Sequence, residues 1–201
     1  VRKNTEVLRI NNYDAWKRPI GTTVALDGGA NYTDTVEYDS IGRVLKRLDS
    51  SGAGRGVEYV YNANGYQSEI KEASTGVAYS TVQGMDAYGN VTTEQLGTGA
   101  SPRITTRSFE PQRGLAVTIK TAYSGGANDI QDLTFTWDLV GNLMSRQDKG
   151  GSRNVTEAFT YDELNRLRTV KLGATTTDTL TFDAFGNIKT KTGVGTYSYL
   201  S

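Results

Sequence analysis

Short runs of alternating apolar and polar residues recur along the whole chain. In one of them, Val36 and Tyr38 point to one face of an extended segment, while Thr35 and Glu37 point to the other. Alternation with a period of two, with polar residues (often threonine) between the apolar positions, predicts half-buried antiparallel strands. Equivalent apolar rows are Val57-Tyr59-Tyr61, Leu133-Phe135-Trp137, Phe159-Tyr161 and Leu180-Phe182.

Each of these runs ends in the same short motif. An aromatic and an acidic residue are followed, three positions after the acid, by glycine and then by arginine or asparagine, as in residues 38–43. The motif recurs about every 24 residues, and a fixed period of this length is typical of repeat architectures. Its copies, some of them degenerate, begin at Tyr13, Tyr38, Tyr61, Met85, Phe109, Trp137, Tyr161 and Phe182.

The motif has the residues of a tight turn. Its aspartate can accept hydrogen bonds from backbone N–H groups two residues on, and its glycine supplies a positive φ. Asn165 replaces the glycine in one copy, and asparagine tolerates the same conformation. A second strand such as residues 44–48 follows the turn and ends in a polar, glycine-rich link. Each repeat is therefore predicted to be a β-hairpin, with roughly sixteen short strands in all.

A single hairpin is only marginally stable in water, so each repeat needs its neighbours. Because strand twist accumulates, a strip of this many strands must coil or close. We predict an all-β fold in which residues 1–201 form one array of about eight antiparallel hairpins, a twisted and spiralling strip. The longest interval between motifs separates Phe109 from Trp137, which predicts an enlarged exposed loop at residues 123–129.

Charge and terminal sequences set further expectations. Lysine and arginine total 22 and so do aspartate and glutamate, so no charge excess favours nucleic acid or anionic lipid as a partner. No apolar stretch is long enough for a transmembrane helix, and no signal segment opens the chain. The sequence begins at Val1, and Tyr199 lies where a further repeat would start. We interpret the chain as a fragment of a longer protein.

The residue types limit the possible chemistry. The sequence has no histidine and no cysteine, which excludes disulfides, Ser–His–Asp and Cys–His catalytic systems and the usual zinc sites. We assign no catalytic, cofactor-binding or metal-binding residue and predict no cofactor and no enzymatic activity. The acids Asp14, Asp39, Asp86, Asp138, Asp162 and Asp183 share one turn position and are interpreted as turn caps.

Three other patterns have simpler interpretations. Residues 52–56 are rich in glycine but lack the Lys-Ser/Thr ending of a phosphate-binding loop, so they are interpreted as a hairpin link. Trp16, Trp137 and the tyrosines could stack on sugars, yet they recur at repeat-equivalent positions and are interpreted as sheet core. A carboxylate hydrolase would require two acids outside the turn positions that face one cleft.

With these motifs in place, the chain resembles the RHS/YD-repeat family, whose core is Tyr-Asp-x-x-Gly-Arg-Leu. Residues 38–44 match this core almost completely, and residues 159–167 and 182–188 are similar to it. The variety most similar is that of bacterial insecticidal toxin complexes and polymorphic toxins. The resemblance implies a strip of sheet that spirals into a hollow shell around a C-terminal toxic polypeptide. It also implies a closing region after the repeats, which this chain does not contain.

The resemblance gives the functional hypothesis. It implies a structural segment of a shell that encapsulates and helps to deliver a toxin, in a bacterial protein that is secreted or lies at the cell surface. The implied partners are the remaining repeats and closing region of the same shell, the enclosed polypeptide and other toxin-complex subunits. Because related repeats occur in adhesion proteins, the alternative is a cell-surface adhesion or glycan-binding segment. A glycan binder should show a cluster of exposed aromatic residues that departs from the repeat pattern.

Overall fold

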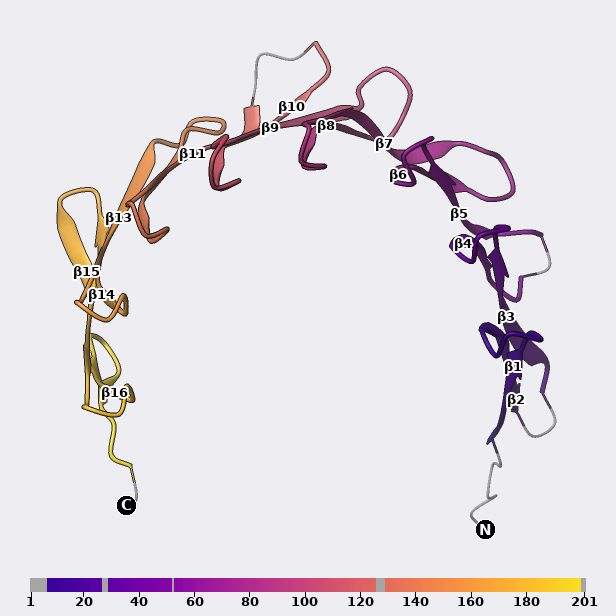
Figure 1. The fold of residues 1–201 in the computed structure, drawn as a ribbon, viewed down its shortest axis with the longest axis horizontal. Coiled ribbons are helices and arrows are strands. Elements are labelled where there is room, and N and C mark those ends of the chain that lie inside the picture. The colour runs from indigo at the N-terminus through magenta and orange to yellow at the C-terminus, as the bar shows by residue number, and fades with distance from the viewer. Residues whose placement is uncertain (1–6, 27–28, 52, 126–128, 200–201) are drawn as a thin grey trace. The chain divides into compact units, whose positions relative to one another are not determined.

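The computed structural model describes residues 7–26, 29–51, 53–125 and 129–199. These residues form 17 β-strands, and the all-β fold predicted from the sequence is confirmed (Figure 1). In the described ranges no helix has the length and apolar character needed to cross a bilayer. Residues 126–128 of the predicted loop lie outside the described residues, and the flanking residues 123–125 are exposed.

The chain divides into two compact units, Val1–Met85 with Glu94–Pro102 and Asp86–Thr93 with Arg103–Ser201. In the first unit, strands β1 to β7 form a meander in which each strand pairs antiparallel with the next. Their bounds are β1 Val7–Tyr13, β2 Pro19–Leu26, β3 Asn31–Tyr38, β4 Val44–Leu48, β5 Gly56–Tyr61, β6 Gln67–Glu72 and β7 Ala78–Met85.

Strand β8 (Val91–Leu96) contributes residues to both units. In the second unit, strands β9 to β17 form a meander of the same kind. Their bounds are β9 Arg103–Phe109, β10 Ala116–Tyr123, β11 Asp129–Trp137, β12 Leu143–Asp148, β13 Val155–Tyr161, β14 Leu167–Leu172, β15 Thr175–Phe182, β16 Ile188–Lys191 and β17 Gly195–Thr196.

The motif turn has one geometry in seven of its eight copies, and the copy that begins at Phe109 has one more residue between Glu110 and the glycine that donates to it. In the second copy, the Gly42 N–H donates to the carbonyl of Asp39, and the Asp39 N–H donates to the carbonyl of Arg43. A type I turn closed by a residue with positive φ is a common three-residue hairpin loop. The predicted positive φ is confirmed, because Gly42, Gly89, Gly141 and Gly186 have φ values of 91°, 87°, 93° and 91°. Asn165 takes the glycine position with a φ of 59°.

A one-residue irregularity follows each turn. Tyr38 pairs with Val44, whereas the preceding Glu37 pairs with Lys46, so the strand after the turn holds one extra residue. The same shift occurs immediately before the aromatic residue in six other copies, those of Tyr13, Tyr61, Phe109, Trp137, Tyr161 and Phe182. Bulges of this kind increase local twist, so the motif sets both the turn and the twist of each hairpin.

The polar side chains of the sheet form ion pairs and hydroxyl pairs across neighbouring strands in both units. Lys46 Nζ lies 3.6 Å from the Glu58 carboxylate in the first unit, and Arg146 pairs with Glu157 in the second. The hydroxyls of Thr160 and Thr169 lie 2.6 Å apart. Opposed threonines and opposite charges both stabilise cross-strand pairs. Further hydroxyl pairs between neighbouring strands are Thr23–Thr33, Thr105–Thr121, Ser108–Thr118, Thr136–Ser145 and Thr181–Thr190.

The apolar face does not form a closed core. No hydrophobic side chain among the described residues is fully buried, and the aromatic rings that begin the motifs are half-buried except that of Tyr13, which is exposed. The sequence analysis interpreted these rings as sheet core; each unit instead exposes part of its apolar face. Hairpin stability therefore depends strongly on the turns and on contacts between adjacent repeats.

Substitution of Gly141 by valine should lower the free energy of unfolding by about 1 kcal/mol or more, because a β-branched residue resists a φ of 93°. A Cβ at this position would meet only Leu115 Cδ1 at 4.0 Å, so backbone strain and not a clash is the cause. Urea denaturation followed by circular dichroism measures the change. Gly141→Asn is the matched control and should cost less; equal loss in both variants would contradict the assignment.

Candidate functional site

The turn aspartate is the centre of each motif. In the second copy, Asp39 Oδ1 accepts the backbone N–H groups of Ile41 and Arg43 at 3.1 and 2.9 Å, and its Oδ2 accepts Arg43 Nε at 2.7 Å. The same three hydrogen bonds occur around Asp14, Asp86, Asp138, Asp162 and Asp183, with arginine or asparagine as the side-chain donor. The predicted role of these acids as turn caps is confirmed.

These hydrogen bonds set the ionisation of the carboxylates. The N–H of Arg166 lowers the pKa of Asp162, although partial desolvation acts in the opposite direction. The side-chain amides of Asn90 and Asn187 likewise lower the pKa of Asp86 and Asp183. A carboxylate that is ionised and fully hydrogen-bonded is unsuited to act as a general acid. The turn acids therefore have a structural role.

The arginine of one motif reaches the aromatic residue of the next. Arg18 Cζ lies 4.2 Å from the centre of the Tyr38 ring, and Arg43 Cζ lies 4.1 Å from that of Tyr61. Arg166 has the same relation to Phe182, at 4.5 Å. Because the turn aspartate already orients each guanidinium, the cation–π contact connects a rigid turn to the following hairpin.

The aromatic residue also bonds the preceding repeat. Tyr38 donates its hydroxyl to the carbonyl of Pro19 at 2.8 Å, and Tyr61 donates to that of Val44 at 2.8 Å. Trp137 donates its indole N–H to Ala116, and Tyr161 donates its hydroxyl to Leu143. Tyr199 makes the equivalent bond to Ile188, so it occupies the aromatic position of a motif. Each acceptor lies at or next to the start of the strand after the preceding motif.

These contacts between repeats are not predicted by the sequence pattern, which indicates only that the aromatic rings form the sheet core. One ring stack, Phe135 with Trp137 within a single strand, is found in the described part of the chain. The available signal was arginine at the sixth motif position together with tyrosine or phenylalanine at the first position of the next copy. Only the side-chain directions show that the two meet.

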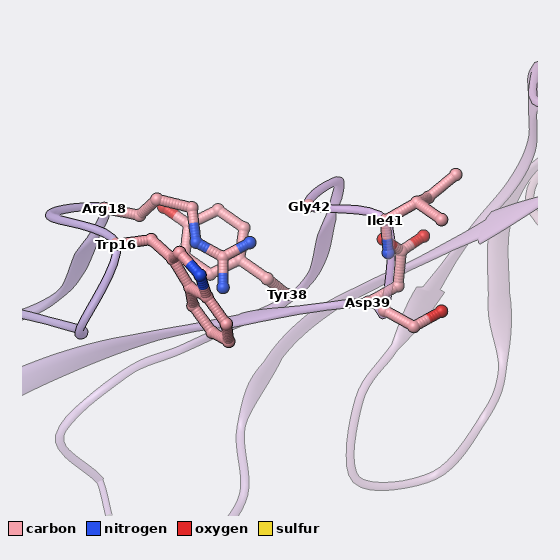
Figure 2. Close-up of a pocket in the computed structure, with 7 residues that line it drawn as sticks. Trp16, Arg18, Tyr38, Asp39, Ile41 and Gly42 are labelled. Atoms are coloured by element: carbon pink, nitrogen blue, oxygen red, sulfur yellow. The ribbon is translucent and has the colours of Figure 1, made fainter.

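The junction of the first two repeats forms an open pocket. Figure 2 shows the Arg18 guanidinium close to the rings of Trp16 and Tyr38, with Ile41 and Gly42 of the next turn opposite. Arg18 Cζ is 4.9 Å from the Trp16 ring centre. A Cβ on Gly42 would lie 3.3 Å from Arg18 Nη1, so glycine leaves room for the guanidinium as well as for the turn.

One other depression brings together two acids outside the turn positions. It is lined by Asp49 and Glu72 with Arg55, Ser74 and Thr75. Both carboxylates cap links: Asp49 accepts the Ser51 N–H, and Glu72 accepts the Ser74 hydroxyl. Hydrogen bonds from these same serines lower the pKa of both acids. A glycosidase needs one carboxyl group with a raised pKa, so this pair does not fit that chemistry.

No cluster of three or more acidic side chains suited to a metal ion occurs in the described ranges. The assignment of no catalytic, cofactor-binding or metal-binding residue remains a prediction. What the geometry offers is a repeated structural unit, in which a turn aspartate orients an arginine or asparagine and an aromatic residue bonds back to the repeat before it.

Solved structures share the fold of most of this chain. The crystal structure of TcdB2-TccC3-Cdc42 matches 93% of the chain with a TM-score of 0.75 and 18% identity. The fold is that of a segment of a Tc toxin chain. The Photorhabdus luminescens Tc holotoxin pore carrying TccC3-D651A matches 93% with a TM-score of 0.73 and 18% identity, and TcdB2-TccC3 matches 89% with 0.72 and 19%. No family model and no curated protein matches.

These matches confirm the resemblance to toxin-complex chains at the level of the fold. The chain spans 11% of the length of the solved chains that it matches. At this identity, the similarity supports the architecture of the hairpin strip, and it does not transfer the activity or partners of the whole toxin.

Replacing Arg43 by lysine should lower the free energy of unfolding by about 1–2 kcal/mol, because the charge remains while the Asp39 hydrogen bond and the Tyr61 contact weaken. Urea denaturation measures the change. Arg168→Lys, at an exposed position of β14, is the control. The loss of unfolding free energy caused by Arg43→Lys should be smaller when Tyr61 is already replaced by leucine. An equal loss in that background would contradict the coupling between repeats.

Acid should destabilise the fold from a defined pH downward. The pKa of each turn aspartate is lowered in the folded state. Its stabilisation is therefore complete above the unfolded value of about 3.9 and is lost as pH falls through the folded pKa. The midpoint temperature of thermal unfolding, measured from neutral pH to strong acid, should be nearly constant down to about pH 4 and should then fall. In the Asp162→Asn variant the midpoint temperature should fall less steeply below pH 4. A loss of stability already present near pH 6 would show that the turn aspartates are not its cause.

Proposed function

We propose that the chain is a wall segment of a hollow shell that encloses a toxic polypeptide and helps to deliver it. The observation that carries the proposal is the fold match over 93% of the chain to a toxin-complex chain, at a TM-score of 0.75. The site geometry supports it, because the repeated turns and the contacts between repeats extend a sheet and present no catalytic arrangement. On this proposal the segment is not an enzyme, and residues 1–201 are one continuous array.

The proposed partners follow from the same role. They are further repeats and the closing region of the same shell, the enclosed polypeptide and other subunits of a toxin complex. A bacterial protein that is secreted or displayed at the cell surface fits such a role. The half-buried apolar face in each unit is suited to a wall, since it needs other protein to complete its burial.

The alternative is an adhesion or glycan-binding segment. Trp16, Tyr88 and Phe185 are strongly exposed aromatic residues, which is the observation in its favour. All three lie at the fourth position of their motif, whereas a dedicated glycan site should depart from the repeat. The shell proposal accounts for their periodicity better.

The test is protease protection in the longer protein that carries this segment. The polypeptide that follows the repeats should resist added protease in the intact protein and should become sensitive when Gly141→Val weakens the wall. A variant with Gly76 replaced by asparagine, at a link where a Cβ would meet no other atom within 4 Å, serves as the control. Equal protease sensitivity in the intact protein and the Gly141→Val variant would overturn the proposal.

The 201-residue chain itself should turn over no substrate in broad glycan and peptide hydrolysis panels, and it should not bind glycan arrays. The physical reason is that its turn carboxylates are engaged as caps. Turnover that disappears when Asp49 or Glu72 is changed to the amide would establish a hydrolase. Glycan binding that disappears in Trp16→Ala would favour the adhesion alternative.

A further inference from the structure

One motif copy differs from the others at the tip of its turn. In the copy that begins at Tyr61, the fourth position is Asn64 and the fifth is Gly65, which is the only Asn-Gly pair in the sequence. The fourth position holds an apolar or aromatic residue in six other copies, as at Ile41 and Leu164. Because those turns form without asparagine at this position, the turn geometry does not explain Asn64.

The surroundings of Asn64 leave its side chain open to reaction. The residue is exposed, and its backbone N–H donates to Asn62 Oδ1 at 3.0 Å. Its side-chain amide makes no hydrogen bond within the part of the chain that the structure describes. Gly65, with a φ of 84°, has no side chain to shield its backbone nitrogen. The Asn64 amide carbon and the nitrogen that follows it are therefore both accessible.

The asparagines at the sixth motif position differ in both respects. Each donates its side-chain amide to the turn aspartate, as Asn187 does to Asp183 at 3.0 Å. Each is also followed by a branched apolar residue, which crowds the next backbone nitrogen. These pairs are Asn90 before Val91, Asn142 before Leu143 and Asn187 before Ile188. They serve as unreactive references within the same chain.

We propose that Asn64 is a site of spontaneous deamidation, with water as the co-reactant. The Gly65 backbone nitrogen attacks Asn64 Cγ, so a new N–C bond forms and the bond from Cγ to the side-chain nitrogen breaks. That nitrogen leaves as ammonia and carries away the proton of the Gly65 N–H. Water then opens the cyclic imide at either carbonyl, which gives aspartate or isoaspartate. Asparagine is among the thermolabile residues of proteins.

The turn slows this reaction without protecting the side chain. The Gly65 N–H donates to the carbonyl of Asn62 at 2.9 Å, and this bond must break before the nitrogen can attack. The loss of one such hydrogen bond corresponds to a rate roughly five-fold lower than in the unfolded chain.

The two products have different effects on the hairpin of β5 and β6. Asn62 Oδ1 accepts the N–H groups of residues 64 and 66, and its carbonyl accepts that of residue 65. Isoaspartate adds a main-chain methylene between residues 64 and 65, so these three bonds cannot all keep their lengths. Aspartate leaves the main chain unchanged. Isoaspartate therefore weakens a single hairpin of the strip, whereas aspartate changes only its charge.

The first test follows the 201-residue chain during incubation in mildly alkaline buffer. Digestion with an acid-active protease stops further conversion, and mass spectrometry then quantifies each asparagine peptide. The peptide that contains Asn64 should convert to aspartate and isoaspartate, while those with Asn90, Asn142 and Asn187 stay unchanged. Conversion of Asn64 no faster than that of Asn187 would overturn the proposal.

The matched variant is Gly65→Asn, which places a side chain beside the attacking nitrogen. Asn165 has a φ of 59° at the equivalent position, so asparagine fits the turn. A Cβ at residue 65 would meet only Arg43 Nη1, at 3.5 Å. The variant should lose most of the conversion at Asn64, with circular dichroism verifying its strands. Unchanged conversion would show that Gly65 does not supply the attacking nitrogen.

A second measurement separates the effects of the two products. The isoaspartate form, isolated by ion exchange from the incubated chain, should have a midpoint temperature of thermal unfolding roughly 2–4 °C lower than the unmodified chain. Asn64→Asp, which has the other product's side chain, should keep the midpoint of the unmodified chain. An equal midpoint in the isoaspartate form and in Asn64→Asp would overturn the proposed weakening of the hairpin.

Discussion

The hydrogen bonds of the motif aspartate are the interaction on which the rest of the structure depends. Through one carboxylate, Asp39 closes the backbone turn and orients Arg43, and Arg43 then lies over Tyr61 of the next repeat. Tyr61 in turn donates its hydroxyl to the carbonyl of Val44, directly after the Asp39 motif. A single ionised side chain thus connects a local turn to the pairing of neighbouring hairpins, which explains how the sheet persists with no fully buried hydrophobic side chain in the described ranges.

The same aspartate limits what the chain can do chemically. Acids on loops are common candidates for catalysis, but here each of the six motif aspartates has two backbone donors and one side-chain donor, as at Asp162. The two acids that share a depression, Asp49 and Glu72, cap links in the same manner. The carboxylates of the motif turns and of these two links therefore act as structural caps.

Much of the fold was predictable because its determinants are local. The alternation of apolar and polar residues predicts the strands, and Asp39 and Gly42 predict the turn, because an Asx cap and a positive φ depend on a few adjacent residues. Contacts such as Arg18 with Tyr38 were not predicted, because they depend on the bulge and on the side-chain direction that it sets. The exposure of Leu164 was missed for a related reason: the apolar pattern identifies a hydrophobic residue but does not show whether a neighbour covers it.

The pairing of each strand with its sequence neighbour affects how such a chain folds and unfolds. Every registered pair joins consecutive strands, as in β4 with β5 and β13 with β14. No distant segments must meet before the sheet can form, so contact order is low and a new hairpin can add to those already synthesised. Unfolding can proceed by the same steps from one end, with each hairpin released separately. Such a strip can therefore be peeled apart gradually, without the loss of one cooperative core.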